Sequence, residues 1–388
     1  MTGVLTYEQA VSAWATHLRT GGTTPWRVWQ ADASADLPVT RPLPDALHLE
    51  LVRRINLAAR GDTGAHGDLR GLADRVFATA APGRGLLDVP LPWPPAPRPF
   101  GTPAIDPEQL PAEELVRLAV GVLGHLLPGV PRPAPEQLPS RWPLPWRRRF
   151  RLHGAPATAA AIRRSLLAQG YVESDWRPTH VVIARPVEVM MAEHWSAVVR
   201  RGGILKWNTT WRRAEAAGRL PSSIDVTAIA NSLQGRRREP VHVVVAREAE
   251  HAAELAAGVL LARPAEIRGS GDAAVSDLLR RLNRFSALTH GPVRVRDLAR
   301  TLVSVLDEEE VASADVEATV TPPASLPWAL AVAATSAGQL RSAGYAVHGD
   351  PDALSPTEHQ LPGTVDRERT LELAVTACVR TWHLGGDP

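Results

Sequence analysis

The chain has 388 residues, of which 44% are hydrophobic and 22% are charged, and Cys378 is its single cysteine. A chain of this length exceeds the size at which one hydrophobic core stops growing, so we expect two or three structural units. The composition excludes a fibrous or fully disordered protein, one cysteine excludes an internal disulfide and a cysteine-rich zinc site, and no apolar run is long enough to span a membrane.

The formal net charge of +2 is distributed unevenly. Residues 141–239 carry 18 basic and 7 acidic side chains, so this segment is strongly positive and the rest of the chain is net negative. Such asymmetry is typical of a surface that binds phosphates, or of a basic centre that matches acidic flanks in the same chain. The start of the chain has no secretory-signal pattern, which together with the single cysteine predicts a cytoplasmic protein.

Residues 1–127 form a predicted helical N-terminal region. Apolar side chains recur at helical spacing in TYEQAVSAWATHLR and DALHLELVRRINLAAR, and a further helix is predicted over residues 112–127. A proline-rich arm is predicted over residues 80–107 and a proline-rich linker over residues 128–146, because proline fixes φ and removes a backbone donor.

Residues 147–265 form a predicted basic α/β domain. The short apolar runs RFRLHG, HVVIA and VHVVVA predict strands, and helical patterns follow each of them. Strands that alternate with helices indicate a parallel sheet with right-handed crossovers. The predicted fold class is therefore α/β, with a central Rossmann-like, three-layer, parallel-sheet domain flanked by mainly helical N- and C-terminal regions.

Residues 266–388 form a predicted C-terminal region that is mainly helical, with a linker near residues 307–325. This region also contains one short strand pattern, which ends in HGDP. The same HGxP pattern ends the first predicted strand as HGAP. Glycine and proline make a compact exit from a strand, so we interpret both copies as turns; a duplicated α/β unit is the alternative interpretation.

The predicted ligand site lies at the carboxyl ends of the strands, where open parallel sheets bind their ligands. His153 and Gly154 end the first strand, Arg185 and Arg247 follow the next two strands, and Thr158 lies near the start of the first helix. Helix N-termini and guanidinium groups both favour an anion, so these five residues are the predicted ligand-binding residues.

The alternative for the two arginines is structural. Arg185 has Glu188 within reach along the chain, and Arg247 has Glu248 beside it. Exposed arginines are common, so both side chains are equally compatible with solvation or with pairing to these carboxylates.

The segment ARPVEVMMAEHW, placed after a strand, a loop and a helix, resembles the P-loop sulfotransferases over residues 149–262. The resemblance implies a first loop that holds a phosphosulfate nucleotide and an Arg-x-Pro segment with a downstream serine that holds its 3′-phosphate. Here HGAPATA has no lysine, Arg185-Pro186 stands in place of Arg-x-Pro, and Ala192 or Glu193 stands where the serine falls.

Arginine is combined with aromatic residues in RWPLPWRRRFRL and WNTTWRR and is clustered in GRRREP, and these residue types neutralise phosphates and stack on bases. We therefore expect a binding or regulatory protein whose basic domain binds nucleic acid or a nucleotide. A transferase that uses a nucleotide donor is the second hypothesis, and a structural protein that docks on an acidic protein partner is the third. The sequence assigns no catalytic residue, metal ligand, cofactor or membrane segment.

Overall fold

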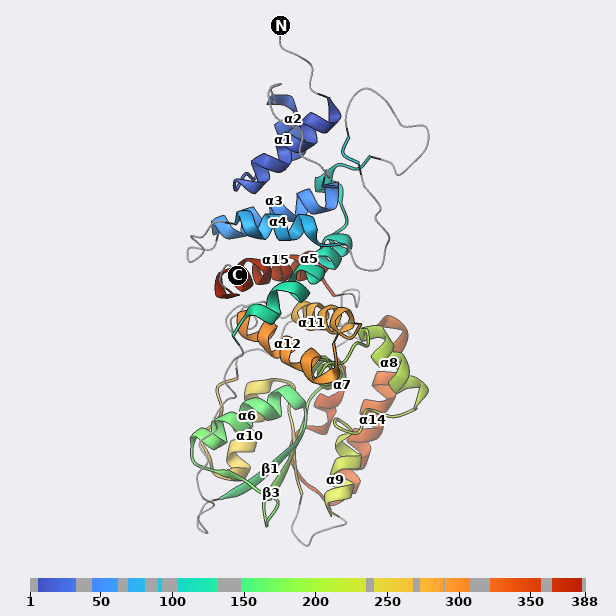
Figure 1. Ribbon diagram of the computed structural model, residues 1–388. Helices are drawn as coiled ribbons and strands as arrows, with labels where there is room; N and C mark the ends of the chain where they lie inside the picture. Colours follow the sequence, from blue (N-terminus) through green and yellow to red (C-terminus); the bar gives the residue numbers. More distant parts are fainter. Residues whose placement is uncertain are drawn as a thin grey trace. The chain divides into compact units, whose positions relative to one another are not determined.

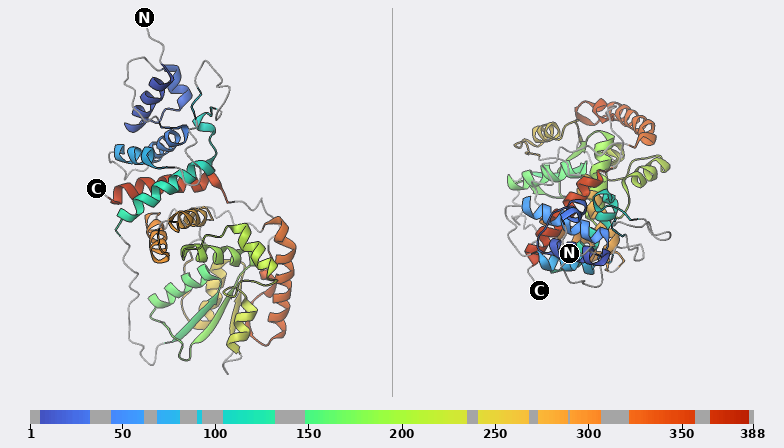
Figure 2. Two further views of the ribbon diagram at one scale, coloured as in Figure 1. Left: turned by 45° about the vertical axis from the view of Figure 1, so that its right-hand side comes forward. Right: turned by 90° about the horizontal axis from the view of Figure 1, so that it is seen from above.

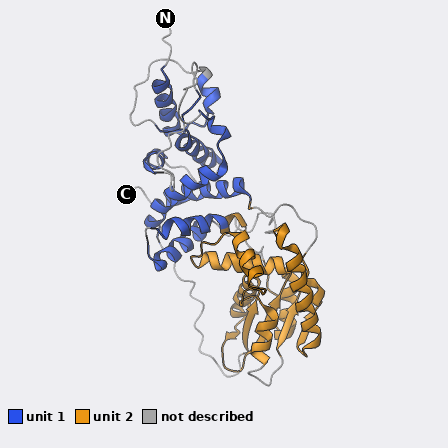
Figure 3. Ribbon diagram, turned by 90° about the vertical axis from the view of Figure 1, so that its right-hand side faces the viewer, with its two compact units in different colours: residues 1–133, 277–307, 366–388 blue, residues 134–276, 308–365 orange. Residues whose placement is uncertain are grey.

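The computed structural model describes residues 6–32, 44–61, 69–80, 90–92, 104–131, 148–234, 241–267, 273–288, 290–306, 322–356 and 365–385. The chain divides into two compact units (Figure 3). Unit 1 comprises residues 1–133, 277–307 and 366–388, and unit 2 comprises residues 134–276 and 308–365. The described residues form 14 α-helices and one five-stranded sheet (Figure 1).

All regular secondary structure in the described part of unit 1 is helical. Its α-helices are α1 (Tyr7–Arg19), α2 (Trp26–Asp32), α3 (Ala46–Gly61), α4 (Arg70–Ala78), α5 (Ala112–Leu126), most of α11 (Ala273–Ser286), α12 (Pro292–Val305) and α15 (Arg367–Gly385). The 3₁₀-helices η1 (Pro107–Gln109) and η2 (Leu127–Gly129) flank α5. The core forms where α15 packs on α5 and α3 (Figure 1), with Cys378 buried between them.

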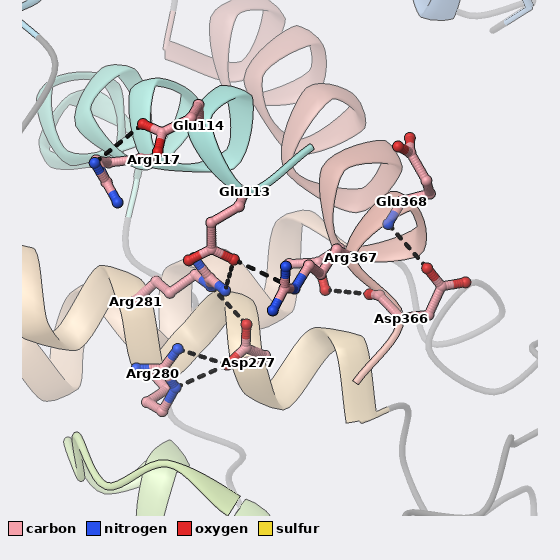
Figure 4. A network of polar contacts seen from close by, with 10 residues as sticks. Glu113, Glu114, Arg117, Asp277, Arg280, Arg281, Asp366, Arg367 and Glu368 are labelled. Atoms are coloured by element: carbon pink, nitrogen blue, oxygen red, sulfur yellow. Dashed lines mark hydrogen bonds and ion pairs between the residues drawn. The ribbon is translucent and has the colours of Figure 1, made fainter. Parts of the chain in front are cut away.

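A network of arginines and carboxylates joins three helices of unit 1 (Figure 4). Arg281 of α11 donates two hydrogen bonds to Glu113 of α5, both 2.8 Å long, and a third of 2.5 Å to Asp277. Arg367 at the start of α15 lies 3.7 Å from the same Glu113 carboxylate. The paired carboxylates hold the pKa of Arg281 above its usual range although burial opposes this, so the ion pairs link α5, α11 and α15.

Unit 2 contains the sheet. Its strands are β1 (Arg149–Gly154), β2 (Val172–Glu173), β3 (Thr179–Ala184), β4 (His242–Val245) and β5 (Ala346–Gly349). All of them pair in parallel, in the order β2-β1-β3-β4-β5. The prediction of an α/β protein with a parallel sheet is confirmed.

The helices of unit 2 surround this sheet. They are α6 (Pro156–Ala168), α7 (Val187–Arg200), α8 (Trp207–Ala216), α9 (Val226–Gln234), α10 (Ala249–Leu260) and α14 (Leu326–Ser342), with the 3₁₀-helices η3 (Pro323–Ser325) and η4 (Pro351–Leu354). Helices α6 and α10 pack against each other (Figure 2). Helix α10 contacts β3 and β4, and α9 contacts β1 and β3. Among the described helices of the whole chain, none is both long enough and apolar enough to cross a bilayer.

The two units are interleaved along the chain. Residues 266–388, which the sequence groups into one C-terminal region, divide between them: α12 and α15 belong to unit 1, whereas α14 and β5 belong to unit 2. The short strand that was expected in this region is β5, and it pairs with β4 as part of the central sheet.

Both HGxP segments form the same turn. Gly154 and Gly349 have φ of 87° and 95°, in the left-handed region that favours glycine. A Cβ at Gly154 would lie 2.0 Å from the carbonyl oxygen of Ile183, and a Cβ at Gly349 would lie 2.0 Å from that of Val245. Each glycine therefore allows its strand to end in close contact with the strand beside it.

Replacing Gly154 with Ala should destabilise unit 2 by about 2 kcal/mol or more, because both the φ angle and the Ile183 carbonyl oppose a methyl group. Urea unfolding followed by circular dichroism measures this change. Gly258→Ala is the control, because Gly258 lies in α10 with open space around it and should gain up to about 1 kcal/mol. Equal effects of the two substitutions would contradict this account of the turn.

Candidate functional site

The strand-end residues meet around one buried carboxylate, that of Glu193 in α7. Its Oε2 accepts hydrogen bonds from the backbone N–H groups of Ala157 (2.8 Å) and Thr158 (3.2 Å), and its Oε1 accepts one from the Thr158 hydroxyl (2.7 Å). Arg185 completes the cluster, because its Nη1 donates to Glu193 Oε1 at 3.1 Å. A carboxylate of the chain itself thus occupies the helix N-terminus at which the sequence predicts an external anion.

The start of α6 explains why this carboxylate is bound there. Pro156 begins the helix, and no side chain from the preceding residue caps it. The first N–H groups of a helix have no partner within it and carry partial positive charge. Glu193 supplies the missing acceptor from a different helix, so it fastens α7 to the N-terminus of α6.

The cluster is shielded from water. Arg185 is 6% exposed, and Thr158 and Glu193 are each 2% exposed. Buried charges are stabilised only when they are paired and hydrogen-bonded, and Glu193 meets this condition with four donors. Arg185 also donates from Nη2 to the Arg247 carbonyl at 3.0 Å, whereas its buried Nε has no hydrogen-bond partner among the described residues.

The five predicted ligand-binding residues therefore have different surroundings. Thr158 and Arg185 belong to the buried cluster, and Gly154 forms the turn before it. Arg247 contributes its backbone carbonyl, while its side chain is exposed and donates to the carbonyl of Ser355 at 3.4 Å. The structure brings the side chains of Thr158 and Arg185 together at the strand ends, and the carboxylate bound to Arg185 comes from Glu193.

His153 contacts a second histidine instead of joining the cluster. Its Nε2 lies 3.2 Å from Nδ1 of His180, and the two rings stack with centroids 5.4 Å apart. The register pairs His153 with Val182, so His180, two residues earlier on β3, lies on the same face of the sheet.

A matching histidine pair lies between β4 and β5. His242 Nδ1 and His348 Nε2 are 3.1 Å apart, and the ring centroids are 5.3 Å apart. Because His242 is in register with Val181 of β3, this pair lies on the face opposite to His180. In each pair, the histidine of an HGxP segment contacts the first residue of an HVV[IV]AR segment on the neighbouring strand.

This correspondence extends to the position of Glu193. Glu193 lies eight residues after Arg185, and Leu255 lies eight residues after Arg247, so the two occupy corresponding positions. The Cδ1 of Leu255 lies 3.1 Å from the place where a Cβ at Gly349 would lie, so it packs against the second HGxP turn. The second copy makes the turn with an apolar side chain, which means that the turn itself does not require a buried ion pair. The HVVIAR and HVVVAR repeat relates the two turns in the sequence, but it does not point to Glu193, because the second copy has Leu255 at that position.

The tryptophans of WNTTWRR belong to the core. Trp207 and Trp211 are buried, and their rings form a continuous series with Trp195 of α7 and Trp328 of α14, with successive centroids 5.6, 5.6 and 6.0 Å apart. They are not available to stack on bases, so this part of the sequence interpretation is wrong. Trp142 and Trp146 of RWPLPWRRRFRL, and all of GRRREP, lie outside the described residues.

Comparison of the chain with protein-family models, with curated proteins and with solved structures finds no match.

Glu193→Leu should lower the free energy of unfolding by about 3–5 kcal/mol, because it leaves Arg185 buried without its carboxylate. The double variant Arg185→Met, Glu193→Leu should recover most of this loss, since it removes both charges. Guanidinium unfolding of the two variants measures the difference. Glu254→Leu replaces an exposed glutamate of α10 and should change stability by less than about 0.5 kcal/mol. If Glu193→Leu has no larger effect than this control, the cluster does not join α6 to α7.

Stability should decrease on acidification. Burial, then the neighbouring His180, then Arg151 lower the pKa of His153 to about 4, and burial and His348 lower that of His242. An unfolded histidine titrates near pH 6.5, so between about pH 6.5 and 4 the unfolded state binds the proton that folded His153 does not. The free energy of unfolding is then constant above this window and falls as the pH drops through it.

Urea unfolding over a pH series measures this dependence. His153→Gln should flatten the profile in part, because His242 still contributes in the same direction. His251→Gln, at an exposed position, is the control and should keep the slope of the unchanged chain. A slope in His153→Gln as steep as that of the control would contradict the role of the histidine pair.

Proposed function

We propose that the protein is a binding or regulatory protein whose α/β unit binds nucleic acid through one basic surface. This surface, called the α8 surface, comprises the cations from the end of α7 to Arg219, which lies shortly after α8. The segment of residues 200–219 carries six cations and one acid, and every one of the six is exposed. They are Arg200, Arg201, Lys206, Arg212, Arg213 and Arg219. This exposed excess of positive charge is the observation that carries the proposal.

The packing of α8 directs these cations outward. Trp207, Trp211 and Ala214 form the buried side of the helix, whereas Arg212 and Arg213 are exposed. The tryptophan series anchors the buried side to α7 and α14. The core thus fixes the orientation of the helix and leaves its basic side for a partner.

Like charges lie close together beside this surface. Desolvation of the guanidinium and the nearby charge of Arg164 on α6 lower the pKa of Arg200. Arginine stays protonated at neutral pH, so the two cations repel each other. A phosphate bound beside Arg200 would be attracted by this local positive charge, which supports phosphate as the partner's charged group.

Nucleic acid fits the α8 surface better than an acidic protein does. Protein interfaces depend on a few apolar or aromatic anchors, whereas binding to a phosphate backbone requires only cations. Ile204 is the exposed large hydrophobic side chain in the segment, and its tryptophans are buried. The α8 surface therefore presents positive charge without the cluster of apolar or aromatic side chains that a protein interface would require.

In this proposal the strand-end cluster of Thr158, Arg185 and Glu193 has a structural role. Glu193 and Arg185 hold the helix whose C-terminus carries Arg200 and Arg201. A nucleotide donor bound at the N-terminus of α6 would have to displace the Glu193 carboxylate, so no observation favours the transferase hypothesis. Contacts of the strands with α10 and with α9, which lie on different sides of them in Figure 1, support a Rossmann-like three-layer arrangement.

Arg213→Glu should weaken binding to a short fluorescent DNA duplex about fivefold or more at low salt, and should reduce the slope of log K against log salt by about one. Fluorescence anisotropy over a series of salt concentrations measures both quantities. Arg263→Glu makes the same change of charge at an exposed position after α10 and should have a smaller effect.

Two results would overturn the proposal. Equal losses in both variants would mean that net charge, and not the α8 surface, sets the affinity. Absence of DNA and RNA binding at low salt, with retention of an acidic polypeptide instead, would favour the docking hypothesis over nucleic acid.

A further inference from the structure

Trp176, in the segment between β2 and β3, is an exposed aromatic residue. It is 62% exposed, whereas the tryptophans of α7 and α8 are buried. Trp176 precedes β3, and its ring contacts Arg149, the first residue of β1, so it lies at the amino edge of the sheet, whereas the Glu193 cluster lies at the carboxyl edge. This ring is therefore separate from the strand-end cluster.

Two arginines flank the indole ring. The guanidinium carbon of Arg149 lies 4.0 Å from the ring centroid, and that of Arg177 lies 5.8 Å from it. A guanidinium over an aromatic face is attracted by the electron density of the ring. The arginines thus place positive charge beside an indole that is still largely open to solvent.

The segment that carries the ring is held in one conformation. The hydroxyl of Ser174 accepts a hydrogen bond from the N–H of Trp176 at 3.1 Å, and Arg151 donates two bonds of 3.0 and 2.8 Å to Asp175. Arg177 has φ of 46°, which is uncommon for a residue other than glycine. These contacts hold the backbone of the segment that carries the ring.

The nearby carboxylates are already paired. Glu173 accepts from Arg151 and Arg163, and Asp175 accepts from Arg151. Within the described residues, no ion pair to a carboxylate neutralises Arg149 or Arg177. The local charge around the ring is therefore positive, which disfavours a cationic ligand and favours an anionic one that also has a flat, aromatic part.

We propose that Trp176 stacks on a base of single-stranded nucleic acid while Arg149 and Arg177 contact the adjoining phosphates. A base supplies the aromatic face and its phosphates supply the charge, so one ligand matches both features. The class of partner rests on the proposed function, but the contact is a second one, at residues that the α8 surface does not include.

The test compares two labelled probes with the full chain: a short oligothymidylate and an abasic oligonucleotide of the same length. Their backbones carry the same charge, so the difference in Kd reports contacts to bases. The unchanged chain should bind the base-bearing probe about tenfold more tightly, as expected for one stacked base. Trp176→Ala should make the two affinities equal, and Trp176→Phe should keep most of the difference because it keeps an aromatic ring.

Leu261→Ala removes another exposed apolar side chain of unit 2, which is 69% exposed, and should leave the difference unchanged. Thermal unfolding checks that each variant is folded. The stacking proposal is overturned if Trp176→Ala preserves the difference in Kd between the two probes, or if the unchanged chain binds both probes equally. In either case, binding of the abasic probe through its phosphates still supports the α8 surface. If neither single-stranded probe binds at low salt, the stacking proposal fails, and the duplex measurement alone decides whether the α8 surface binds nucleic acid.

Discussion

The hydrogen bonds from the first turn of α6 to the Glu193 carboxylate fix how α7 packs beside α6 in unit 2. A helix N-terminus at the end of a strand has unpaired N–H groups and a positive field, and in a parallel sheet it requires an anion or water. In this chain a residue from the middle of α7 supplies the anion, and Arg185 neutralises it. For Glu193 to reach Ala157, α7 has to pass beside α6, and the cations of the α8 surface begin at the C-terminal end of α7.

The elements whose evidence is local could be predicted from the sequence. The strands β1, β3 and β4 are short apolar runs, and α7 shows its apolar residues at every turn, so periodicity alone locates them. The convergence of Thr158 and Arg185 follows from the geometry of any parallel sheet. The role of Glu193 does not, because it depends on where α7 packs, and nothing in a lone glutamate beside His194 indicates this.

The tryptophans also show that the sequence alone does not predict which side chains are buried. Trp207 and Trp211 stand beside arginines in the sequence, and one pattern fits both an amphipathic helix in a core and a surface for bases. Their burial decides between the two, and burial depends on α14, more than a hundred residues away. Trp176 stands in a short polar segment without periodicity, so its exposure and its stacking with Arg149 could not be derived from spacing. The pairing of β5 with β4 likewise joins residues that are distant in the sequence, so local patterns do not predict it.

The interleaving of the two units constrains how the chain can fold during its synthesis. Unit 1 includes α1, but α15 packs on α3 and α5, so its core stays incomplete until the ribosome has made α15. The sheet of unit 2 is likewise incomplete until β5 has been synthesised and has paired with the edge of β4. Strand β4 therefore has an open edge while the intervening helices of unit 1 are translated, and an open edge can pair with other chains. Neither unit can complete its fold well ahead of the other, so a nascent chain that stops before residue 346 leaves both of them unfinished.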